Sequence, residues 1–307
     1  MKTLRPTSLA FAAALSALTL AATPAWADPF AFSTGDPDGK LASASRPSSS
    51  GKLEIESADD FILAGQTRIT SASFTGLLTS AAAAPFTSLL NPGANAATIG
   101  SVVIEIYRVF PFDSNDPPSG KVPTRVNSPS DVAFESRASV ASELSYATKV
   151  LATTFTAANS VLNGIKPLPN QATGGEGAVT GEEVRFDVTF SSAFDLPAGH
   201  YFFIPQVEVS GGEFFWLSSP KPITGGTGPF APDLQSWVRN EDLAPDWLRL
   251  GTDITGQGPF NASFSLAGDV QAAVPEPASY ALMLLGLAAI AGGARSRARR
   301  AEADRWH

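Results

Sequence analysis

The fold class is decided by the clearest strand in the chain, Val102-Val103-Ile104-Glu105-Ile106-Tyr107-Arg108-Val109-Phe110. Val102, Ile104 and Ile106 fall on one face, and the residues between them fall on the other. Alternation with a period of two residues is the side-chain pattern of a β-strand, because successive side chains point to opposite faces of a sheet. This stretch therefore predicts a strand with at least one buried face.

Similar segments recur along the chain and indicate an all-β body. Residues 184–190 alternate as cleanly as 102–110, with Val184, Phe186 and Val188 on one face. Further predicted strands cover 53–56, 58–63, 66–78, 148–157, 201–209, 214–217, 236–239, 247–250 and 264–270. Many short strands separated by turn residues are typical of a β-sandwich. We expect one jelly-roll-like β-sandwich with long loops.

The segments between these strands carry turn residues. Residues 28–51 are expected to be an irregular lead-in, and 81–97, 111–129, 163–181 and 220–232 to be loops. Residues 130–144 predict a short helix with Ser130 as its N-cap. Gly211-Gly212 predicts a hairpin turn. Pro205 is expected on an edge strand or at a bulge, since proline cannot donate to a sheet ladder.

The N-terminus has the three parts of a secretion signal. Lys2 and Arg5 supply positive charge, residues 9–20 are apolar, and Ala25-Trp26-Ala27 ends in the small-residue pattern that signal peptidase cleaves. We therefore expect a signal helix in residues 1–27, cleavage after Ala27, and a mature body in an extracytoplasmic compartment.

A second apolar segment lies near the C-terminus. Residues 278–294 contain no charge, and 17 residues are just enough to cross a hydrocarbon core of about 30 Å as a helix. Four arginines at 295–300 favour leaving that end in the cytoplasm. This predicts a transmembrane helix at 278–294, a basic stop at 295–300 and a cytoplasmic tail at 301–307. The length of this segment and the charge after it would also suit a plain membrane anchor with a single span.

The residues before this segment distinguish a sorting signal from a plain membrane anchor. Val274-Pro275-Glu276-Pro277, followed by the apolar run and the arginines, resembles the PEP-CTERM sorting signal of bacterial exosortase substrates, over residues 273–300. The resemblance implies processing by a membrane-embedded exosortase near Pro275, Glu276 and Pro277, after a transient hold at the inner membrane. It also implies delivery to the envelope surface or an exopolysaccharide matrix. The prolines favour an extended, unpaired segment.

The body, residues 28–272, is similar to uncharacterised extracellular β-domains that precede such signals, on stretches such as 104–109, 127–132 and 245–249. This resemblance implies no activity. The body holds 14 basic and 26 acidic residues, a net charge of about −12. Such a charge argues against nucleic acid as a partner. The absence of cysteine excludes thiol chemistry and cysteine metal sites.

Catalytic patterns are sparse in the body. His200 is its single histidine, and it is interpreted as a structural residue at a turn. The carboxylate doublets are Asp59-Asp60, Glu182-Glu183 and Glu241-Asp242. Adjacent residues on a strand point to opposite faces, so a doublet is not a catalytic pair. We therefore expect no enzymatic activity and no required cofactor.

Two kinds of binding site have candidate residues. Calcium prefers carboxylate oxygens, and the oxygen-rich turns offer Asp36, Asp38, Asp113 and Asp116. The first turn is not an EF-hand, because Lys40 and Pro47 occupy ligand positions. Exposed tryptophan faces stack on sugars, which makes Trp216, Trp237 and Trp247 the candidates for glycan binding. Core packing is the competing interpretation for all three.

The sequence as a whole therefore predicts an exported protein of the cell surface or exopolysaccharide matrix, with a structural, adhesive or glycan-binding role. Its expected partners are signal peptidase and exosortase during export, and a surface glycan afterwards. A secreted hydrolase with a site built from loops and a calcium-stabilised surface module are the alternatives.

Overall fold

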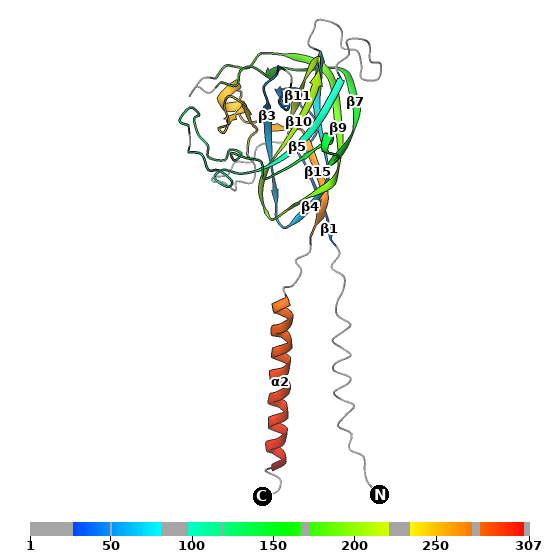
Figure 1. The fold of residues 1–307 in the computed structure, drawn as a ribbon, viewed down its shortest axis with the longest axis vertical. Coiled ribbons are helices and arrows are strands. Elements are labelled where there is room, and N and C mark those ends of the chain that lie inside the picture. Colours follow the sequence, from blue (N-terminus) through cyan, green and yellow to red (C-terminus); the bar gives the residue numbers. More distant parts are fainter. Residues whose placement is uncertain are drawn as a thin grey trace. The chain divides into compact units, whose positions relative to one another are not determined.

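The computed structural model describes residues 27–49, 51–80, 98–117, 119–166, 172–220, 234–271 and 277–303 (Figure 1). The chain divides into two units. One is the body, Ala27–Gln271, and the other holds both chain ends, with the helix α2 (Pro277–Ala303). Residues 1–26 of the predicted signal helix and the predicted loop at 81–97 lie outside the described residues.

The larger sheet of the body is organised around one long central strand, β4 (Thr67–Ser80). One edge of β4 pairs with β9 (Val179–Leu196), which in turn pairs with β7 (Leu144–Ala157). The other edge pairs first with β15 (Phe264–Val270) and then with β11 (Gly212–Ser219). The remaining strands extend that side; they are β1 (Asp28–Ser33), β2 (Leu41–Ala44), β8 (Asn159–Val161) and β14 (Asn261–Ala262).

The second sheet has six strands, all antiparallel. Its order is β13 (Leu248–Arg249), β12 (Trp237–Asn240), β3 (Ile55–Leu63), β10 (Gly199–Ser210), β5 (Thr98–Arg108) and β6 (Glu135–Ala138). β10 lies between β3 and β5, as Figure 1 also shows.

The two sheets share one core. The largest cluster of buried apolar side chains takes residues from β4, β9, β11 and β15 of the larger sheet and from β3, β5 and β10 of the smaller one. Phe74 stacks on Phe186 with ring centroids 4.9 Å apart, and Phe203 of the smaller sheet stacks on Phe264 of the larger one at 5.0 Å. The prediction of an all-β body is therefore confirmed. Its closure as a jelly roll stays a prediction.

Gly76 shows how tightly β4 and β11 approach. A Cβ atom at this position would lie 2.2 Å from the Phe214 ring and 2.5 Å from the carbonyl oxygen of Phe215. We expect Gly76→Ala to lower the free energy of unfolding by about 1–3 kcal/mol, because overpacking forces neighbours to move and the carbonyl belongs to a paired strand. Denaturant unfolding measures this. Gly65→Ala is the control, since its Cβ would meet only Val270 at 3.6 Å, and equal losses for both variants would contradict the argument.

Most strand predictions are confirmed. The stretch 102–110 lies largely in β5, whose Val102, Ile104 and Ile106 enter the shared core. The stretch 184–190 lies in β9, with its predicted face buried. The short predicted strands around the acidic turn at 240–246 are β12 and β13, which pair with each other.

Three local predictions are wrong, and tertiary pairing explains each. Residues 130–144 hold β6 and a 3-10 helix, Ser139–Ala141, instead of an α-helix, because β6 adds to the edge of β5. Gly211-Gly212 is no hairpin turn, since β10 and β11 belong to different sheets. The lead-in at 28–51 contains β1 and β2, which pair with β15 and β11.

Pro205 lies in an interior strand and not at an edge. It opposes Ile104 of β5, whereas β3 pairs with β10 only over Gly199–Phe203. At Pro205, β3 no longer pairs with β10, and Ser45 takes its place: the Ser45 hydroxyl donates to the carbonyl of Pro205 at 2.6 Å. A bulge follows in β10 between Val207 and Val209.

The predicted apolar segment 278–294 lies within α2. Pro277 is the first residue of this helix and is not extended; proline suits a first turn, which needs no amide donor there. Pro275 and Glu276 lie outside the described residues. Among the described residues, no helix combines the length and apolar character needed to cross a membrane.

Candidate functional site

The two predicted processing points flank a pair of neighbouring strands. β1 pairs with β15 along its whole length, from Asp28 opposite Val270 to Ser33 opposite Ser265. Ala27 is exposed and directly precedes β1, and residues 273–277 follow shortly after β15. On the other side of β15, Gln271 extends the pairing with β4, because its amide donates to the carbonyl of Gln66 at 2.8 Å. The body therefore begins and ends at one edge of the larger sheet (Figure 1).

The tryptophan candidates for glycan stacking are buried. Trp216, Trp237 and Trp247 are 2%, 1% and 0% exposed. The indole nitrogen of Trp216 donates to the carbonyl of Ser263, and that of Trp247 donates to the carbonyl of Ser130. The prediction that these faces meet a sugar is therefore wrong, since all three serve core packing.

The four aspartates predicted as calcium ligands do not converge. Asp38 accepts hydrogen bonds from Ser218 and Lys40, whereas Asp36 is exposed. Asp113 forms an ion pair with Arg108, and Asp116 is exposed on the same loop. Within the described ranges no three acidic or histidine side chains gather as metal ligands. A calcium requirement stays a prediction.

His200 is buried and paired. Its Nε2 lies 2.5 Å from Asp60 Oδ2, and Asp60 Oδ1 accepts the amide of Leu234 at 2.9 Å. The ring also stacks on Phe202. Its Nδ1 is buried and makes no hydrogen bond in the part of the chain that the structure describes. The pair links β10 to β3 and to the segment that begins at residue 234.

A cluster of carboxyl groups and one arginine lies on the smaller sheet. We call it the carboxyl–arginine cluster; its members are Glu54, Glu56, Glu105, Tyr107 and Arg239. Glu56 is at the centre: it accepts a hydrogen bond from the Tyr107 hydroxyl at 2.7 Å and another from Arg239 Nε. The sequence analysis did not single out this cluster. The signals that could have indicated it are weak: Glu54 and Glu56 are two residues apart, and Glu105 and Tyr107 lie on one face of β5.

The protonation of this cluster is unusual. Burial, with the charge of Glu56 and a hydrogen bond to it, raises the pKa of Glu105 to about 8. Burial also raises the pKa of Glu54, although a hydrogen bond from Gln206 opposes the shift. At neutral pH the Glu105 carboxyl is therefore protonated and can donate to the Glu56 carboxylate, so the two groups share one proton.

Arg239 compensates the negative charge of Glu56 and connects the cluster to neighbouring loops. Its guanidinium lies 4.3 Å from the centroid of the Trp247 ring and donates to the carbonyl of Asp131 at 3.1 Å and to the Tyr107 hydroxyl at 2.9 Å. Arg125 is similarly buried and forms ion pairs with Asp131 and Asp246. These contacts fasten the segments around Asp131 and Asp246 to the sheet.

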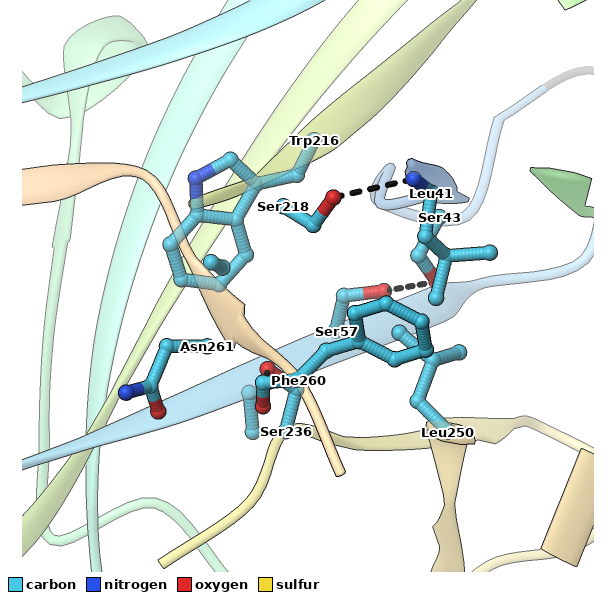
Figure 2. Close-up of a pocket in the computed structure, with 11 residues that line it drawn as sticks. Leu41, Ser43, Ser57, Trp216, Ser218, Ser236, Leu250, Phe260 and Asn261 are labelled. Atoms are coloured by element: carbon cyan, nitrogen blue, oxygen red, sulfur yellow. Dashed lines mark hydrogen bonds between the residues drawn. The ribbon is translucent and has the colours of Figure 1, made fainter. Parts of the chain in front are cut away.

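A small cavity lies between β2, β3 and β11 (Figure 2). Ser43 and Ser57 form a hydrogen bond of 2.7 Å across it, and the amide of Leu41 donates to Ser218 Oγ at 2.9 Å. Its volume of about 10 Å³ has room for a single water molecule. The cavity is thus a packing feature of the body.

Comparison with known proteins gives one match. Residues 273–300 match the PEP-CTERM protein-sorting motif. The chain matches no curated protein and no solved structure. The motif indicates export, anchoring in the membrane through the C-terminal segment, and subsequent exosortase processing. The chain therefore carries, at residues 273–300, the sorting signal of an exosortase substrate.

Proposed function

We propose that the body is a non-catalytic structural or adhesive module, displayed on the cell surface or in the exopolysaccharide matrix after exosortase processing. The observation that carries this proposal is the pairing of β1 with β15. It brings both ends of the body to one edge of one sheet, so a single tether at that edge leaves the rest of the surface available to partners.

The contacts of the titratable side chains support a structural role. Glu56, Arg239, Arg125 and Asp246 hold loops onto the smaller sheet, and Asp60 with His200 joins neighbouring strands. We infer that the two sheets close as a jelly-roll-like sandwich around the shared core, which suits a stable secreted domain without disulfides. A loop-built hydrolase and a calcium-stabilised module stay predictions.

Sorting is tested by replacing the motif in the native host. We expect a variant with Pro275→Ala, Glu276→Ala and Pro277→Ala to stay in the membrane fraction at full C-terminal mass. The wild-type protein should end near the motif and move to the surface or matrix fraction. Mass spectrometry of both fractions measures this. Asp304→Asn, beyond the basic stop, is the control and should sort normally. A mature wild-type protein with α2 intact would contradict processing.

The role of the body is tested separately in a deletion strain. Loss of cell–cell cohesion or surface attachment, restored by the wild-type gene and not by the motif variant, is the expected result. Unchanged cohesion in the deletion strain would contradict an adhesive or structural role, whatever the sorting result.

A further inference from the structure

A pocket of about 210 Å³ opens between the end of β5, Phe112 and the turn that joins β9 to β10. Its lining includes Arg108, Phe112, Pro197, Gly199 and His200. We call it the Arg108 pocket. It is smaller than the pockets that hold drug-sized ligands, so it suits a single ring with its substituents.

Arg108 is held in a fixed orientation at this pocket. One face of its guanidinium lies 3.9 Å from the centroid of the Phe134 ring. Its Nε lies 3.4 Å from Asp113 Oδ2, and Asp113 occupies the left-handed backbone region with φ of 54°. The stacking and the ion pair together immobilise the group before any ligand binds, which reduces the ordering cost of binding.

The outer edge of the guanidinium is left for a ligand. The ion pair with Asp113 uses Nε, and the Arg108 side chain is 30% exposed at the pocket, so its two terminal amino groups can reach a ligand. A planar pair of N–H donors matches the two oxygens of a carboxylate. The nearby Glu135 carboxylate is already paired with Arg137 at 2.6 Å. Arg108 is therefore the cation that an acidic ligand would meet.

The remaining walls fit a ring. Phe112 is 46% exposed, so its flat side chain can cover an apolar ring face. Pro197 and Ala198 are exposed on the opposite turn, and Gly199 keeps that wall close to Tyr201, since a Cβ there would lie 3.0 Å from the Tyr201 ring.

We propose that the Arg108 pocket binds a sugar ring carrying a carboxylate, a uronic acid, with Arg108 on the carboxylate and Phe112 against the ring. The inference rests on the proposed function, because it names the class of surface glycan that the body would engage. A free uronate and a uronate residue within a polymer present the same group to the pocket.

Calorimetric titration of the full-length protein in detergent tests the proposal. Glucuronate should bind and glucose should not, since only the first carries the carboxylate. Polygalacturonate in place of glucuronate separates the polymer from the free sugar: tighter binding of the polymer identifies a chain as the ligand. Wild-type protein that binds neither acidic probe would overturn the proposal.

Variants locate the site. Arg108→Met, which keeps an apolar side chain beside Phe134, should weaken uronate binding at least tenfold, and Arg108→Lys should recover part of it. Arg185→Met is the matched control, because Arg185 is an exposed arginine paired with Asp187 outside the pocket. Ala198→Phe should block the pocket from its rim and needs no change at Arg108. Binding that survives both Arg108→Met and Ala198→Phe would overturn the assignment. The cohesion assay separates this failure from failure of the proposed function. If the deletion strain loses cohesion and a gene carrying Arg108→Met restores it, the body is adhesive or structural without a ligand in the Arg108 pocket.

Discussion

Arg239→Met is expected to lower the free energy of unfolding by about 3–5 kcal/mol, the largest effect of any single substitution considered for this body. Arg239 is 7% exposed and is the cation beside Glu56. Methionine fills much of the same space but leaves the Glu56 carboxylate buried with only the Tyr107 hydroxyl and the Glu105 carboxyl as partners. Thermal unfolding should show a decrease of about 6–20 °C in the melting temperature, at roughly 2–4 °C per kcal/mol.

Two further variants separate the buried ion pair from loss of charge alone. Arg185→Met removes an arginine that is 41% exposed and should change stability by less than about 0.5 kcal/mol. Glu56→Met combined with Arg239→Met should cost less than Arg239→Met alone, because the Glu56 carboxylate that Arg239 pairs with is also removed. If the effects of Glu56→Met and Arg239→Met on the free energy of unfolding simply add in the double variant, the two side chains are not coupled.

The sequence predicts the sheets better than their assembly. Strands with strict alternation, such as β5 and β9, are recognisable because one face enters a core. β1, β2 and β6 are missed because they are short or carry polar residues, and they are strands only through pairing with β15, β11 and β5. The same reason explains Gly211-Gly212, where local turn chemistry is correct but the partner strands belong to different sheets.

The site residues divide in a similar way. The sorting motif is readable because it depends on a contiguous stretch, and the family comparison confirms it. The sequence allowed the three tryptophans to be either glycan-stacking or core residues, and their burial shows that they are core residues. The pairs that matter in the body, Glu56 with Glu105 and Asp60 with His200, are separated by about 50 and 140 positions and meet only through the order β12-β3-β10-β5. Doublets in the sequence could not reveal them, since contact across strands depends on the sheet order.

The second large effect is a loss of stability between pH 4.5 and 8. In the unfolded chain Glu105 has its ordinary pKa of 4.5, whereas in the folded body its pKa is raised to about 8 by burial and by Glu56. Below pH 4.5 both states hold the proton. As the pH rises through the window, the unfolded chain releases it and the folded body does not, so the free energy of unfolding falls by up to about 5 kcal/mol, at most about 1.4 per pH unit. Above pH 8 this contribution is constant. Denaturant unfolding at a series of pH values measures the slope.

Glu105→Gln should remove this slope and make the body more stable than wild type by about 1–3 kcal/mol at pH 8, because the amide still donates to Glu56 but carries no proton to lose. The raised pKa of Glu54 leaves a smaller slope of the same sign in the variant. Glu241→Gln is the control, since Glu241 is exposed beside the same cluster and should leave the pH profile within about 0.5 kcal/mol of wild type. An unchanged profile in Glu105→Gln would show that Glu105 is ionised in the folded body at neutral pH. Arg239 would then have to balance two carboxylates, and the cost of Arg239→Met should exceed the range given above.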